Sequence, residues 1–192
     1  MEPLEPNTAL FLAVSWACGI NLYAALGILG YFVARGALIL PNELLLLGDS
    51  NMLIALGLLY LAGFIIDKTP YVDSIWDGVH TFIRIPGAIV FAYFFFPPSM
   101  MLRPVAAVAA GILAAISHSE KLLFRLIVNR SPEPFTNILT SVFEDAMVFG
   151  VIWLSVRHSS LFLVVFSFML LSLYWILPLC WRQALRFFEW PE

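Results

Sequence analysis

The residues of this sequence that could do chemistry gather in a few short stretches, and the densest is 67-DKTPYVDSIWDGVHTFIR-84. It holds three Asp, one Lys, one His and one Arg between two strongly apolar segments. Carboxylates can bind cations or exchange protons, and Lys and Arg can bind anions such as phosphate. Groups of this kind are costly near the centre of a bilayer and are rarely found there without a role. The stretch therefore predicts a polar site at membrane depth.

The polar residues of this stretch recur at the spacing of a helix. They follow one another at i, i+4, i+7/8 and i+11 and would share one helix face: Asp73, Asp77, His80, Thr81 and Arg84. Lipid does not accept such a stripe, so we expect it to face other helices or a water-filled interior.

Two later segments carry polar residues at similar spacing. The first has a histidine and two bases at i, i+3 and i+7: His118, Lys121 and Arg125. The second has two neutral residues followed by two adjacent acids: Asn137, Ser141, Glu144 and Asp145. Adjacent side chains on a helix point about 100° apart, so only one of the two acids can point fully at a shared site. We expect the three stripes to face each other, with nearly equal numbers of acids and bases available for pairing.

Composition indicates that the helices carrying these stripes lie in a membrane. The chain is 61% hydrophobic and only 12% charged, whereas a soluble domain is roughly half apolar and about a quarter charged. The net charge of −3 and the lack of a basic block give no support for nucleic-acid binding. Cys18 and Cys180 lie in apolar runs without metal-type spacing, and no cofactor is predicted. The start of the chain has no Lys or Arg, so its first apolar run is expected to be a permanent span.

Six apolar segments approach the roughly 20 residues that a spanning helix needs. They are about 8–35, 45–66, 74–96, 101–128, 136–156 and 159–181. They predict an all-α polytopic membrane bundle, with residues 1–192 in a single domain. The segment 182–192 is expected to start with a short interfacial helix, since it is rich in aromatic and basic residues. Six spans put both termini on one side of the membrane. The distribution of Lys and Arg between the loops of the two sides favours a cytoplasmic location for the termini.

The opening stretch has a counterpart later in the chain. Both 67-DKTPYVDSIWDGVHT-81 and 129-NRSPEPFTNILTSVFED-145 begin with Asp or Asn, a cation, Thr or Ser, and Pro. Each follows one apolar helix and opens another. This predicts an internal repeat of two helical hairpins, about 45–96 and 101–157, as is common in membrane carriers. Their motif-bearing ends would meet at one polar cavity.

At these residues the chain resembles a bacterial integral-membrane family catalogued as domain of unknown function 4126. The matching stretches are 19-GINLY-23, 67-DKTPYVDSIWD-77, 80-HTFIRIPG-87, 118-HSEK-121 and 141-SVFED-145. The resemblance covers about residues 10–157 and departs at His80, where an amide is expected in many relatives. It implies a multi-span protein of the bacterial inner (plasma) membrane and assigns no activity.

The leading functional interpretation is transport or permeation of a small ion or of a polar, phosphate-bearing solute. The groups expected to handle cations or protons are Asp73, Asp77, Glu144 and Asp145. The expected counter-charges or anion contacts are Arg84, Lys121 and Arg125. Polar neighbours on the same faces complete the predicted site: His80, Thr81, His118, Asn137 and Ser141.

Two alternatives stay open. Asp73 and Asp77, with Glu144 near, could hold Mg²⁺ for an enzyme that acts on a lipid phosphate. The sequence contains no HExxH, GxSxG or P-loop motif, so an enzyme is not favoured. The other alternative is a non-transporting structural subunit or assembly factor, in which the polar network only sets helix packing. Besides the lipid bilayer, the expected partners are a small ion or phosphate-bearing ligand and a second copy of the chain, because six short spans enclose little volume.

Overall fold

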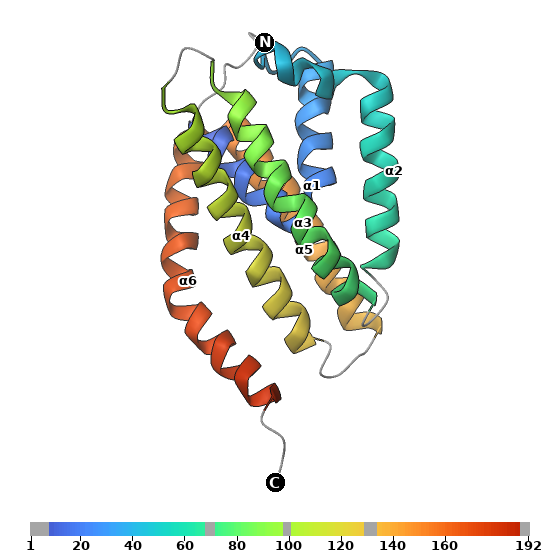
Figure 1. Cartoon of the computed structure of the whole chain (residues 1–192), viewed down its shortest axis with the longest axis vertical. Coiled ribbons are helices and arrows are strands. Elements are labelled where there is room, and N and C mark those ends of the chain that lie inside the picture. Colours follow the sequence, from blue (N-terminus) through green and yellow to red (C-terminus); the bar gives the residue numbers. More distant parts are fainter. Residues whose placement is uncertain (1–7, 68–71, 98–100, 129–133, 189–192) are drawn as a thin grey trace.

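The computed structural model describes residues 8–67, 72–97, 101–128 and 134–188, and these residues form helices and no β-strand (Figure 1). The elements are α1 (Thr8–Ala34), η1 (Asn42–Gly48), α2 (Ser50–Ile66), α3 (Val72–Phe95), α4 (Arg103–Val128), α5 (Pro134–Arg157) and α6 (Ser159–Phe188). The all-helical prediction is confirmed. Within the described residues, four helices are long and apolar enough to cross a membrane: α1, α3, α4 and α5. The pair η1 and α2, bent by 65°, would make a fifth span.

Helix α1 is the centre of the bundle, and it is broken in its middle. It packs against α3, α4 and α5, and more of it is buried than of the other long apolar helices. Asn21 has extended backbone angles, with φ −150° and ψ 96°, inside the otherwise helical run. The Oδ1 atom of Asn21 accepts a hydrogen bond from the backbone N–H of Ala24 at 3.2 Å, as an N-cap residue does. Asn21 therefore ends one helix and starts the next.

The two halves of α1 return to the same end of the bundle. The ring of Phe11 packs on that of Phe95, the last residue of α3, with centroids 6.1 Å apart. Beyond the second half, Glu43 lies 4.0 Å from Arg103, the first residue of α4. Arg103 also donates a hydrogen bond to the backbone carbonyl of Tyr93, so the last turn of α3 and the first turn of α4 lie at the same end of the bundle. Figure 1 shows the two halves of α1 diverging from a shared tip, and we name this tip, residues Gly19–Asn21, the α1 tip.

This path corrects the predicted topology. The segment 8–35 was expected to cross the membrane once, but its two halves enter and leave at one end of the bundle. The start of α1 and the end of α6 consequently lie at opposite ends (Figure 1), whereas six crossing spans would put them together. Residues 182–188, where a separate interfacial helix was expected to start, instead continue α6, which runs through Pro178 to Phe188. Hydropathy alone could not show either feature, since a folded-back helix and a crossing helix are equally apolar.

The helix pairing also differs from the predicted pair of hairpins. Helix α3 packs most extensively against α4, and α1 makes large interfaces with both of them and with α5. Helices α4 and α5 make few mutual contacts, although they were expected to form one hairpin. The internal repeat remains a prediction from sequence.

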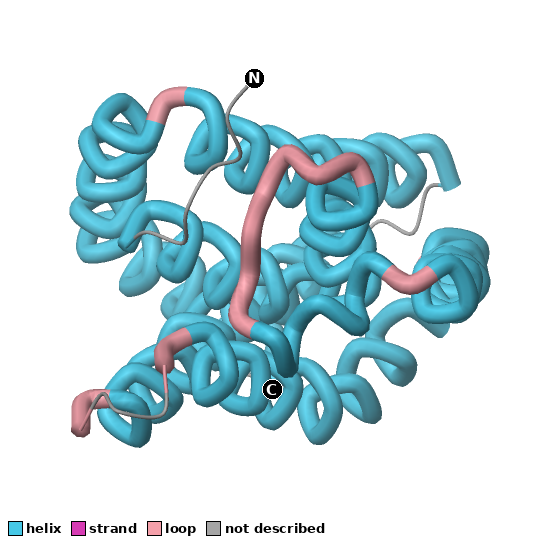
Figure 2. The backbone as a smooth tube through the Cα atoms, turned by 90° about the horizontal axis from the view of Figure 1, so that it is seen from above, coloured by secondary structure: helices cyan, strands magenta, loops and turns pink. Residues whose placement is uncertain are grey.

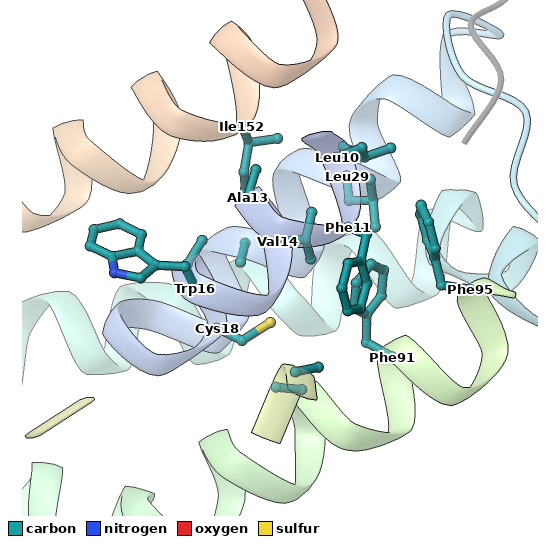
Figure 3. Packing of buried hydrophobic residues seen from close by; sticks show 14 of the residues in the cluster. Leu10, Phe11, Ala13, Val14, Trp16, Cys18, Leu29, Phe91, Phe95 and Ile152 are labelled. Carbon is teal, nitrogen blue, oxygen red and sulfur yellow. The ribbon is translucent and has the colours of Figure 1, made fainter. Parts of the chain in front are cut away.

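The apolar core follows from the central place of α1. Buried side chains of both its halves pack on α3 and α5, and Figure 3 shows the cluster: Leu10, Phe11, Val14, Trp16, Leu29, Phe91, Phe95 and Ile152 among its members. The loop 35–41 crosses one end of the bundle in the end-on view of Figure 2 and buries Leu38 and Leu40. The bundle is thus packed around a hairpin that brings the α1 tip between α3, α4 and α5.

Candidate functional site

Six described side chains, three acidic and three basic, form one ionic network beside the α1 tip. They come from the end of α2 and from α3, α4 and α5: Asp67, Asp77, Arg84, Lys121, Arg125 and Glu144. All six are buried, and Asp77 and Arg125 have no exposed surface. The balance of signs matters because an unpaired charge in such an environment is strongly destabilising.

Lys121 is the hub of this network. Its Nζ atom lies 3.0 Å from Asp77 Oδ1, 3.3 Å from Asp67 Oδ2 and 3.5 Å from Glu144 Oε2. One ammonium group on α4 thereby ties α3, α5 and the end of α2 together. Arg84 shares the Asp77 carboxylate with it, at 2.8 Å from the same Oδ1 atom.

Arg125 makes the most specific contact of the network. Its Nε and Nη2 atoms donate to the two carboxylate oxygens of Glu144, at 3.1 and 2.7 Å. Its Nη1 atom donates to the backbone carbonyl of Asp67 at 2.9 Å and to Oδ1 of Asn137 at 2.5 Å. A two-point arginine–carboxylate contact fixes both position and orientation, so α4 and α5 are held in a single register here.

Two polar side chains of α4 contact backbone carbonyls at the break in α1. In an unbroken helix the N–H of Ala24 would bond the carbonyl of Ile20, but it bonds Asn21 Oδ1 instead. Lys121 Nζ lies 3.5 Å from that Ile20 oxygen. The Nδ1 atom of His118 lies 3.2 Å from the Gly19 oxygen. The charged network and the α1 tip are therefore one structure.

Gly19 permits this close approach. A Cβ atom at this position would lie 2.0 Å from Ser117 Oγ and 2.2 Å from the Ala114 oxygen, distances that no real Cβ atom tolerates. Ser117 in turn donates to the carbonyl of Trp16 at 2.7 Å. The absence of a side chain at residue 19 is thus a requirement of the packing between α1 and α4.

The two predicted histidines lie in separate polar contacts. The Nε2 atom of His118 lies 2.7 Å from Thr81 Oγ1, which connects α4 with α3. The Nε2 atom of His80 lies 3.2 Å from the hydroxyl of Tyr23, and its Nδ1 atom lies 2.9 Å from the carbonyl of Trp76. His118 therefore belongs to the network at the α1 tip, whereas His80 supports the second half of α1.

Most of the predicted site residues come together in the structure. Those in or directly beside the network are Asp77, Thr81, Arg84, His118, Lys121, Arg125, Asn137 and Glu144. Ser141 is buried on α5 between Asn137 and Glu144 in the chain. The side chain of Asp73 lies outside the described part of the structure.

Asp145 departs from the network, as expected for one of two adjacent acids. Its Oδ1 atom accepts from Asn21 Nδ2 at 3.0 Å, and its Oδ2 atom accepts from the hydroxyl of Tyr60 at 3.0 Å. This agrees with the expectation that only one of the two adjacent acids can point fully at a shared site, because Glu144 and Asp145 leave α5 in different directions.

Sequence reasoning missed several members of the site. Asp67 was not among the predicted site residues, yet only 4% of it is exposed and its carboxylate contacts Lys121. Asn21 was not among the predicted site residues either, although its side chain caps the second half of α1. The signal that could have marked the break is the pair Gly19 and Asn21 at the centre of a long apolar run.

The described residues offer no group of three or more His, Cys, Asp or Glu that could hold a metal ion. The physical reason is that Asp77 and Glu144 already contact Lys121, and each also contacts an arginine. Asp73, the third member of the predicted Mg²⁺ site, lies outside the described side chains, so that site stays a prediction from sequence.

The outer surface of the bundle defines the class of the protein. Large apolar side chains are exposed on its helices, among them Leu58 of α2, Phe82 of α3 and Phe168 of α6, while the charged groups of the network are inside. In a soluble protein charged side chains lie mostly on the surface, and large apolar side chains lie mostly inside. Exposed apolar side chains and buried charges, together with the apolar helices, are typical of a polytopic membrane protein.

Within that class, the chain belongs to the family described as Domain of unknown function (DUF4126), which matches residues 8–179. The match confirms the resemblance inferred from the motifs of the sequence. Comparisons with curated proteins and with solved structures gave no match.

Proposed function

We propose that the protein is a membrane carrier for a small ion or polar solute, and that the α1 tip and the ionic network form its transport site. The observation that carries the proposal is the broken, folded-back α1, whose tip carbonyls lie against Lys121 and His118 of α4. Non-helical backbone at membrane depth is tolerated only where protein buries it or where it lines a cavity. Membrane carriers use such breaks to bind ions and polar substrates.

Asp77 is the carboxylate through which exchange would occur. It is fully buried, and its Oδ1 atom lies within 3.0 Å of both Arg84 and Lys121. Its Oδ2 atom has no hydrogen-bond partner among the described residues. A buried acceptor without a donor costs about 1–3 kcal/mol. A proton or a small cation bound at Oδ2 would remove this cost.

Ion binding at Asp77 would be coupled to the rest of the network through Lys121. Neutralising Asp77 weakens its attraction for the Lys121 ammonium group, which then interacts more with Asp67 and Glu144 or with a solute. A phosphate-bearing solute is one variant of the proposal, since lysine and arginine are suited to phosphate.

The test combines ligand binding with flux. Purified protein is screened by thermal unfolding against monovalent and divalent cations, inorganic phosphate and lipid phosphates. A ligand that binds only the folded state raises the unfolding temperature with its concentration. We expect a stabilising ligand for the wild type and none for Asp77→Asn, and we expect Asp77→Asn to abolish flux of that ligand in proteoliposomes while the variant remains folded. Glu43→Gln, which removes an acid from the partly exposed end of the bundle, serves as the matched control.

A structural subunit is the second candidate, and the balanced pairing of the network favours it. Ionic contacts from Lys121 and Arg125 fix the arrangement of four helix segments without any ligand. In that case Asp77→Asn lowers the unfolding temperature strongly, no tested ligand stabilises the wild type, and proteoliposomes show no flux. That set of results would remove the carrier proposal.

A further inference from the structure

A separate polar feature lies in a groove between the second half of α1, α2 and α5. The groove has a volume of about 470 Å³, within the roughly 300–1,000 Å³ typical of small-molecule sites. In Figure 1, α2 stands at the edge of the bundle beside this half of α1. The lining is apolar apart from one acid and three tyrosines: Tyr23, Tyr31, Tyr60 and Asp145.

The acid in this groove has no counter-charge among the residues that the structure describes. Within the described part of the chain, Asp145 accepts hydrogen bonds from two neutral groups, the amide of Asn21 and the hydroxyl of Tyr60. None of the ion pairs of the described residues includes it. Its neighbour Glu144, by contrast, contacts both Lys121 and Arg125. A negative charge in a largely apolar wall attracts a cation more strongly than the same charge in water.

We propose that this groove binds a small, water-soluble amphipathic organic cation, with its charged nitrogen at Asp145 and its apolar body along the groove. An ammonium nitrogen suits the carboxylate, and aromatic rings such as those of Tyr23 and Tyr60 attract cations as well. The rest of the ligand meets apolar side chains, including Leu53, Leu56 and Phe149. Tyr31 carries the guanidinium of Arg35 over its ring at 5.3 Å, so its ring already has a cationic neighbour.

Other ligand classes fit the groove less well. A metal ion such as Mg²⁺ needs several oxygen ligands, but the hydroxyl of Tyr60 and the amide of Asn21 already donate to the Asp145 oxygens. A phosphate group, including that of a zwitterionic lipid, would find no Lys, Arg or His among the lining residues. The inference stands apart from the proposed transport function, because it uses none of the six side chains of the ionic network.

The test uses phenethylammonium as the probe, titrated calorimetrically into the purified protein in a nonionic maltoside detergent. Its neutral analogue 2-phenylethanol and its anionic analogue 3-phenylpropanoate have nearly the same shape. We expect saturable binding of the cation, at least about tenfold weaker binding of the alcohol, and no binding of the anion, because only the cation gains from Asp145. Equal binding of the alcohol and the cation would overturn the proposal.

Three variants locate the binding. Asp145→Asn keeps the shape of the side chain and is expected to abolish binding, whereas Glu43→Gln removes an acid elsewhere and is expected to retain it. Gly57→Leu blocks the groove while leaving Asp145 unchanged, and a Cβ at residue 57 meets no atom within 4 Å. It is also expected to abolish binding, and it decides the question if Asp145→Asn does not fold. Unchanged affinity in Gly57→Leu, or in a folded Asp145→Asn, contradicts the proposal.

A last arm separates a soluble amine from a lipid. Phosphatidylethanolamine is added to the micelles at increasing ratio before the probe is titrated. We expect the affinity for phenethylammonium to be unchanged. Displacement of the probe by one equivalent of this lipid would instead identify a lipid amine as the occupant and would overturn the proposal of a soluble one.

Discussion

The side-chain amide of Asn21 donates to Oδ1 of Asp145 at 3.0 Å, across 124 residues of sequence. The same side chain accepts from the N–H of Ala24 and so begins the second half of α1. One residue thus joins three features of the molecule: the break in α1, the ionic network on one side of it, and the groove on the other. Changes at the α1 tip should separate the contributions of these features.

Asn21→Ala removes both hydrogen bonds of this side chain. We expect a loss of stability of about 1–3 kcal/mol, because the helix loses its N-cap and Asp145 loses one of its two described donors. The amide of Ala24 should exchange with solvent faster, which hydrogen exchange would measure. Asn51→Ala, at an exposed position on α2, is the control and should change stability by less than about 0.5 kcal/mol. Equal effects of the two substitutions would remove the special role of Asn21.

Gly19→Ala tests the contact between α1 and α4. The added methyl group would overlap Ser117 Oγ and the backbone oxygen of Ala114, and the latter cannot move without shifting α4. We expect a loss of about 1–3 kcal/mol or more, as for other overpacked cores. Gly78→Ala is a matched control, since a Cβ there meets no atom within 4 Å in a helix and alanine favours helices. The unfolding temperature should fall for the first variant and stay level or rise for the second.

Arg125→Gln tests the energetics of the ionic network. It leaves Glu144 with Lys121 alone, at 3.5 Å, and should lower stability by about 3–5 kcal/mol. The double variant Arg125→Gln with Glu144→Gln should be more stable than Arg125→Gln, because it removes the acid left without its arginine. Arg35→Gln at an exposed site controls for the loss of a positive charge. If the double variant is no more stable than the single one, the pairing of these two residues is not what stabilises the site.

The path of α1 can be tested by cysteine labelling in membranes. In a background with Cys18 and Cys180 replaced by alanine, single cysteines are placed at three positions. They are Thr8, at the start of α1, Ile39, in the loop that follows α1, and Val72, at the start of α3. A membrane-impermeant maleimide should label positions 8 and 39 from the same side and position 72 from the opposite side. Labelling of positions 8 and 39 from opposite sides would show instead that α1 crosses the membrane.

Much of the site could be predicted because helical spacing and lipid act locally. Asp77, Thr81 and Arg84 recur on one face of α3, and Lys121 and Arg125 recur on one face of α4. A bilayer does not accept such faces, so they had to point inward, and the network confirms it. The partner of each charge was not predictable, since several acids lay within reach of each base. Asp67 belongs to the network only because the end of α2 contacts Lys121 and Arg125 of α4.

The sequence by itself determined that this chain forms long apolar helices with inward polar stripes, because both properties depend on neighbouring residues and on the solvent. Only the tertiary structure decided that α1 folds back at Asn21, that Glu144 joins the network, and that Asp145 faces the groove. The reason is that these outcomes depend on contacts between distant segments: Gly19 with Ala114, Lys121 with Ile20, and Asn21 with Asp145. Hydropathy is the same for a helix that crosses and for one that returns, so packing makes the choice.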